Sequence, residues 1–138
     1  MSLRDLTERL EALTGATPGV EAAALVSEEG VVLASALPHD VDPGQAARVG
    51  KALADVGTSA MHQLARGDAE EVLVRSAHGW SVVLTATNAT AVRLVVLAAR
   101  HASVALLLLE ARKAADDLAL LVGEGLVPKE ARHGDAVG

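Results

Sequence analysis

The stretch RLVVLAARHASVALLLLEAR, residues 93–112, decides the fold, because it reads either as one membrane span or as two separate elements. A membrane-spanning helix needs about 20 mostly apolar residues in a row. Arg100 and His101 interrupt the apolar run after Ala99, and neither half is long enough to cross a bilayer. We therefore expect a strand, then a separate helix, and no membrane span.

Composition narrows the classes of function. The chain has 138 residues, enough for one domain with a sizeable core. Its formal net charge of -6 disfavours nucleic-acid binding, which rests on clustered Lys and Arg. Trp80 is the only aromatic residue, so base stacking is excluded and a small-molecule pocket is disfavoured. Without cysteine, no disulfide or thiolate metal site can form. The charged start MSLRDLTERL predicts no secretory signal and a cytoplasmic location.

The N-terminal third predicts a helix followed by a β-hairpin. Leu3, Leu6, Leu10 and Leu13 recur at helical spacing, with Ser2 as a candidate N-cap. The turn formers in TGATPGV end this helix. Residues 20–27 (VEAAALVS) and 31–37 (VVLASAL) then form two short strands, joined by a turn in which Gly30 takes positive φ.

The rest of the chain predicts a helix, three strands and a last helix. Asp42 is a candidate N-cap with Pro43 at the first helical position, and the helix runs to about Ala65. Strands follow at residues 70–76, 80–86 and 91–98, and a helix at 103–122 stops at Gly123. Short turns between sequential strands predict an α+β fold with a five-stranded antiparallel sheet. The domain is expected to cover residues 1–122, with 123–138 as a flexible tail.

The second helix carries more apolar surface than docking on one sheet requires, because its apolar arc exceeds the roughly 100° needed. One stripe on the helical wheel consists of Val49, Leu53, Val56, Ala60 and Leu64. A neighbouring stripe of mostly small residues consists of Ala47, Gly50, Ala54, Gly57 and Met61. Either the helix is deeply buried in its own core, or one stripe meets the sheet and the other meets a second chain. The sequence does not say which stripe faces which.

The strand at residues 70–76 also favours self-association. At a sheet edge it would expose an unpaired ladder, a liability unless the edge is blocked or paired. No proline blocks this strand, and pairing with its twin would satisfy two-fold symmetry. Val72 and Val74 therefore join both stripes of the second helix as predicted dimer contacts. The last helix shows a similar surplus, because Leu106, Leu109 and Leu120 point away from its main apolar face.

No residue pattern predicts catalysis, a metal or a cofactor. His39, Asp40 and Asp42 lack a second ligand cluster, so loop solvation and helix capping are favoured. The Gly50-Lys51 pair fails the phosphate-loop spacing and is followed by alanine rather than Ser or Thr. An interaction module is therefore favoured over an enzyme. A small ligand-sensing α+β domain of a signalling system is the alternative.

Three segments resemble the roadblock, or dynein-light-chain, family over most of residues 3–122. They are TPGVEAAALVSEEGVVLAS, RGDAEEVLVRSAHGWSVVLTATNATAVRLVVLA and LLLLEARKAADDLALL. The marks are Gly19-Val20 entering the first strand, Gly30, Gly79 and the RKAA sequence from Arg112. An Asp-Gly is more usual in the family where this chain has Glu29-Gly30.

This resemblance implies a non-enzymatic homodimer in which the second helix and third strand of each subunit meet their twins, giving a continuous ten-stranded sheet. It further implies, for bacterial members, a Ras-like small GTPase as partner, whose hydrolysis is promoted or which is held on a platform. Eukaryotic members scaffold motor and signalling complexes. Arg48, Lys51 and His62 on the polar arc of the second helix are candidate partner contacts. High Ala and Arg-over-Lys usage suggests a bacterial source.

Overall fold

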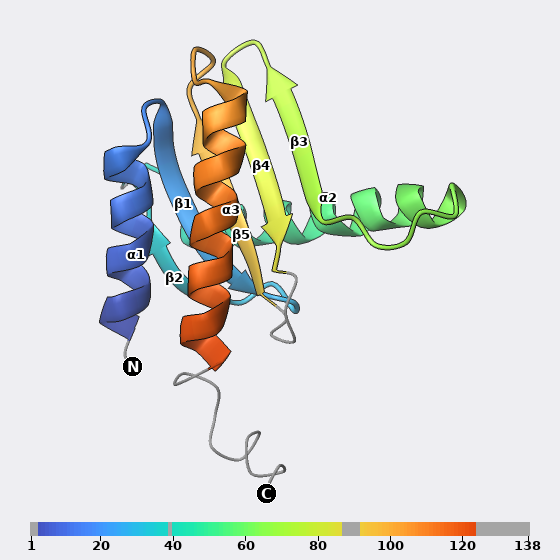
Figure 1. The fold of residues 1–138 in the computed structure, drawn as a ribbon, viewed down its shortest axis with the longest axis horizontal. Helices are drawn as coiled ribbons and strands as arrows, with labels where there is room; N and C mark the ends of the chain where they lie inside the picture. The colour runs from blue at the N-terminus through green and yellow to red at the C-terminus, as the bar shows by residue number, and fades with distance from the viewer. Residues whose placement is uncertain (1–2, 39, 87–91, 124–138) are drawn as a thin grey trace, which may run out of the picture.

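A computed structural model describes residues 3–38, 40–86 and 92–123 of the chain. The elements follow the predicted order, with three helices and five strands (Figure 1). They are α1 (Leu3–Ala16), β1 (Val20–Ser27), β2 (Val32–Ala36), α2 (Pro43–Gln63), β3 (Glu71–Ser76), β4 (Gly79–Thr85), β5 (Val92–Ala98) and α3 (Val104–Leu121). Ser2, His39, Asn88 and the tail beyond Gly123 lie outside the described residues.

The five strands form one antiparallel sheet in the order β2-β1-β5-β4-β3. Figure 1 shows α1 and α3 side by side on one face, while α2 runs across the strands on the other face. The predicted α+β class is confirmed. The strand predicted at residues 70–76 is β3, and it lies at an edge of the sheet.

Local sequence signals explain the turns. Gly30 has φ of 93° in the β1–β2 turn, a conformation that side chains with a Cβ rarely adopt. The β3–β4 hairpin is tighter, because Ser76 pairs directly with Gly79 across the turn residues Ala77 and His78. Each turn fixes which residues of its two strands pair, as the lengths of the two loops dictate.

Helix caps also match the sequence. The Asp42 carboxylate accepts hydrogen bonds from the backbone N–H groups of Gly44 and Gln45 at 3.4 and 3.3 Å, and Pro43 begins α2. Ser103 caps α3 by accepting from the N–H of Leu106 at 3.3 Å. Since β5 ends at Ala98 and α3 begins at Val104, the long apolar stretch is two elements, as predicted. No helix in the described part of the chain combines the length and apolar character needed to cross a membrane.

Two apolar layers hold the fold together, one on each face of the sheet. The larger lies under α1 and α3 and contains the fully buried side chains Leu6, Leu10, Leu25, Leu84, Leu94, Leu107 and Leu118. The smaller lies under α2 and consists of Ala24, Val26, Ala47, Ala54, Val83 and Val95. The second layer is built from smaller side chains, so α2 sits close to the sheet.

Candidate self-association and partner interface

Two glycines set how closely α2 approaches its own sheet. A Cβ on Gly50 would lie 2.4 Å from Cγ2 of Val95 in β5. A Cβ on Gly57 would lie 2.5 Å from Cγ2 of Val72 in β3. Separations this short are far inside van der Waals contact, which begins near 3.5 Å for two carbons. Glycine at both positions is therefore what lets the helix backbone rest directly on the strands.

This packing decides which apolar stripe of α2 faces inward. Ala47, Gly50 and Ala54 are buried against the sheet, so these three predicted dimer contacts are occupied within the chain. Gly57 of α2 lies directly against Val72 of β3, so these two predicted dimer contacts also face each other within the chain. The small residues that sequence reasoning reserved for a close approach of a second chain instead admit the molecule's own sheet. The neighbouring stripe, which we call the outer stripe of α2, is turned away from the sheet, with Val56 68% and Leu64 64% exposed, while Leu53 is half-buried.

The C-terminal part of α2 extends past the edge of the sheet. Gly50 lies under β5 and Gly57 under β3, so seven residues carry the helix across two strand intervals. Seven residues rise about 10 Å, and two strand intervals measure about the same. Another seven residues separate Gly57 from the cap residue Leu64, yet β3 is the edge strand. Figure 1 shows these last turns projecting beyond β3. We call residues 58–64 the overhang.

An uncovered row of side chains lies beside α2 on the same face of the sheet. Val74, Ser81 and Leu97 are neighbours across β3, β4 and β5, one row along from the residues that α2 covers. Val74 is 42% exposed, and the Ser81 hydroxyl is buried without a hydrogen-bond partner. A mainly apolar hollow of about 180 Å³ opens here, with Val49 of α2 among its lining residues. Ser81 and Leu97 line this hollow together with Val49, and we call the hollow and the outer stripe of α2 beside it the α2 groove.

The three predicted partner contacts lie on the polar side of α2, and each has a carboxylate neighbour. Arg48 lies 3.9 Å from Asp42, and Lys51 donates to Asp55 at 2.8 Å. The hydrogen bond from Lys51 lowers the pKa of Asp55 below its ordinary value, and the charges of Lys51 and Arg93 act the same way. Their effect exceeds the opposing one of desolvation.

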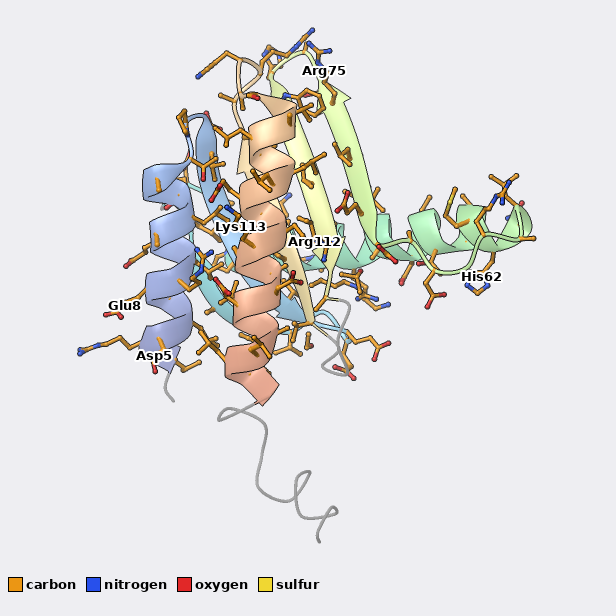
Figure 2. The ribbon with its side chains drawn as sticks, viewed as in Figure 1. Asp5, Glu8, His62, Arg75, Arg112 and Lys113 are labelled. Carbon is orange, nitrogen blue, oxygen red and sulfur yellow. The ribbon has the colours of Figure 1, made fainter. Side chains whose placement is uncertain are left out.

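His62 is the third predicted contact and pairs with Asp68. Figure 2 shows it near the projecting end of α2. All three side chains are more than two-fifths exposed, so they remain accessible to a partner.

A larger hollow lies on the other flank of α2 and is lined mainly by polar residues. It measures about 700 Å³ and includes Glu28, Asp55, His62, Asp68 and Arg93. It opens to solvent and has no aromatic wall, unlike the enclosed apolar pocket typical of ligand-binding sites. Within residues 3–38, 40–86 and 92–123, no group of three or more acidic or imidazole ligands is placed to hold a metal.

Two arginines that position the edge of the sheet were missed in the sequence. Arg112 of α3 donates to the backbone carbonyls of Thr85 and Glu70 at 3.0 and 3.3 Å and pairs with Glu71 at 3.1 Å. Figure 2 shows it between α3 and the strands. Arg100 donates to the carbonyls of Ser76 and Ala77 at 3.3 and 3.4 Å. Both tie β3 in place at its two ends, through contacts that no local pattern signals.

Solved structures with the same arrangement include roadblock proteins. A Roadblock/LC7 domain from Streptomyces avermitilis is 26% identical, with 87% of this chain and 96% of that chain covered and a TM-score of 0.71. Myxococcus xanthus MglB is 19% identical, with 92% and 93% covered and a TM-score of 0.79. The profilin of a LokiProfilin1/rabbit actin complex shares the fold at 11% identity, with 88% and 98% covered and a TM-score of 0.61.

The comparison with curated proteins gave no match. The family model described as Roadblock/LC7 domain matches residues 6–98, from α1 to the end of β5. This span includes the overhang, the edge strand and the α2 groove, and it is about two thirds of the chain. The chain therefore belongs to the Roadblock/LC7 domain family.

Proposed function

We propose that the protein is a non-enzymatic homodimeric interaction module that regulates or scaffolds a Ras-like small GTPase in the cytoplasm. The overhang of α2 is the observation that carries the dimer. Two helical turns with Ala60, Met61 and Leu64 on their apolar side extend past the chain's own sheet. A helix of this kind gains stability only when another surface covers it, because most helical stability in proteins comes from packing.

A second copy supplies a surface of matching size. If two β3 strands pair across a two-fold axis, the sheet continues from one subunit into the other. Each overhang, about two strand intervals long, then lies beneath β3 and β4 of its twin. There it meets Val74 and Ser81 of that row and the outer stripe of the other α2. The contact surface proposed comprises Val49, Leu53, Val56, Ala60, Met61, Leu64 and Val74.

The GTPase partner rests on membership of the family. The dimer places two α2 helices next to each other, with their polar sides facing outward. Arg48 is the candidate contact with the most exposed side chain, 72% accessible. A paired surface of this kind would hold a loop of the GTPase in one conformation, so regulation works by positioning rather than by catalysis within this chain. This mechanism predicts no need for a metal or cofactor in the module itself.

The dimer is tested by Val56→Asp. Val56 is exposed in the single chain, so a carboxylate there leaves the fold intact but is desolvated at the dimer contact. We expect monomers in sedimentation velocity, with an unchanged melting profile at low concentration. Leu3→Asp is the matched control, because Leu3 is 58% exposed on α1, on the face of the sheet opposite α2. A Val56→Asp protein that sediments as the wild type does would refute the interface.

The regulatory role is tested with a Ras-like GTPase encoded beside this chain's gene. We expect the protein to bind the GTPase and to change its rate of GTP hydrolysis, and Arg48→Glu to weaken both effects while the dimer persists. Leu3→Asp again serves as the control for a surface change elsewhere. Absence of both binding and any change in turnover would remove the GTPase from the proposal and leave the dimer untouched.

A further inference from the structure

A second unpaired surface lies on α3, on the opposite side of the sheet from α2. Leu109 and Leu120 are 53% and 57% exposed on the outer side of this helix. Lys113 and Asp116 lie between them and are also exposed. At about 100° per residue these four side chains fall within about 60° of one another. We call Leu109, Lys113, Asp116 and Leu120 the outer stripe of α3.

The order of residues in this stripe is self-complementary. From Leu109 the intervals are four, three and four residues, and they are the same when counted back from Leu120. Reversal therefore keeps each leucine in a leucine position and exchanges the lysine with the aspartate. Two copies of the stripe laid antiparallel bring leucine against leucine and lysine against aspartate at every level. Antiparallel pairing is also the arrangement that a two-fold axis across a helix generates.

We propose that α3 of a second copy docks antiparallel on the outer stripe. Leu109 packs on Leu120 of the second copy, and Lys113 pairs with Asp116 of the second copy; the two-fold axis repeats both contacts. The proposal does not depend on the α2 interface, because the two surfaces lie on opposite faces of the sheet (Figure 1).

Charge complementarity selects a second copy as the occupant. Within the chain Lys113 lies 3.4 Å from Glu110, and Asp116 lies 3.9 Å from Arg112. Both pairs lie along α3 itself and leave the ends of the side chains exposed. A single charge flanked by leucines would suit many partners, but a lysine and an aspartate that exchange places on reversal suit this same helix. One helix face buries less than the roughly 1,200 Å² of standard interfaces, so the association is weak and depends on concentration.

Charge reversal with rescue tests the proposal on the full-length protein. In sedimentation velocity at rising concentration, the wild type should show one association step beyond the species present at low concentration. Lys113→Glu alone and Asp116→Lys alone each turn two attractive pairs into repulsive ones and should weaken that step about tenfold. The double variant, Lys113→Glu with Asp116→Lys, restores both pairs with reversed polarity and should recover the step.

The controls separate this contact from its alternatives. Glu8→Lys reverses an exposed charge on the neighbouring helix α1 and should leave the step unchanged (Figure 2). Melting curves of every variant check that the fold persists. Val56→Asp removes the α2 contact, so the weak step should then link monomers rather than dimers.

Three outcomes would overturn the proposal. One is the absence of any added step up to about 1 mM, the weak limit of specific association. Another is a double variant as weak as the single ones, which would indicate an occupant other than a second copy. The third is a step that appears only after residues 124–138 are deleted, which would assign the stripe to the chain's own C-terminal segment. Loss of the α2 dimer alone would leave this proposal standing.

Discussion

At the scale of single residues, the end of α2 shows a conformation that its sequence does not favour. Ala65 has φ of 57°, in the left-handed region that glycine usually occupies after a helix. Its N–H donates to the carbonyl of His62, and the N–H of Arg66 donates to the carbonyl of Met61 at 2.8 Å. This is the hydrogen-bond pattern of a Schellman motif, formed with alanine in place of glycine. The residue that follows the overhang is therefore strained.

Ala65→Gly should stabilise the protein, because it removes the contact between Cβ and the backbone that left-handed φ imposes. We expect a gain of about 1 kcal/mol in the free energy of unfolding. Urea denaturation at one fixed protein concentration measures it. Ala52→Gly is the control, since Ala52 is exposed within α2 and glycine there should cost roughly 0.5 to 1 kcal/mol. Equal destabilisation by both changes would contradict this interpretation of Ala65.

Single residues also mark the limit of prediction from sequence. Asp42 was recognisable as a cap, because a cap acts on the three residues that follow it, whereas Ser103 was predicted as the first residue of the last helix and is its N-cap. The contacts of Arg112 were not recognisable, because its acceptors, Thr85 and Glu70, lie in a different part of the chain. Long side chains reach partners that only the assembled fold defines.

At the scale of elements, α2 shows how far periodicity can be trusted. The helical wheel correctly indicated two apolar stripes, but it could not assign them, because both are apolar enough to be buried. The structure assigns the stripe with Gly50 to the sheet, since only small residues allow the backbone this close to Val95. In α3 the surplus leucines were predicted from the same periodicity, and Leu106, Leu109 and Leu120 are exposed.

Gly50→Ala should destabilise the protein although alanine is the better helix former. The added Cβ lies 2.4 Å from Val95, a buried side chain held between α2 and the sheet, so the helix must move outward. We expect a loss of about 1 to 3 kcal/mol in the free energy of unfolding. Gly15→Ala in α1 is the matched control, because its Cβ would meet nothing within 4 Å. There the helix preference alone operates and should add roughly 0.5 to 1 kcal/mol. Stabilisation by both substitutions would mean that α2 is not held this close.

At the scale of the whole molecule, stability is unevenly distributed along the fold. The larger layer buries α1 and α3 on the sheet, while the overhang and β3 keep most of their side chains exposed. Regions with few buried apolar contacts open locally at low free-energy cost. The single chain therefore combines a well-packed half with an edge that we expect to open at lower free-energy cost.

Hydrogen exchange should reveal this difference through its dependence on concentration. We expect amides in residues 60–64 and on the free edge of β3 to exchange quickly in dilute solution and to become protected as the protein is concentrated. Mass action favours the species in which those groups are covered. Amides in β1 and β5, which have strands on both sides, should show the same protection throughout. Mass spectrometry at two concentrations provides the measurement, and an unchanged overhang would count against its burial in a dimer.

Because the α2 groove and the outer stripe of α3 lie on opposite faces of the sheet, together they determine how large an assembly of copies can become. A molecule with one self-complementary surface assembles no further than a dimer, since dimerisation occupies its only interface. A molecule with two such surfaces on opposite sides still has one unoccupied surface after each further copy has bound. Copies joined alternately through the two surfaces would either close into a ring with a fixed number of subunits or extend into a filament. The angle between the two symmetry axes decides which of these forms.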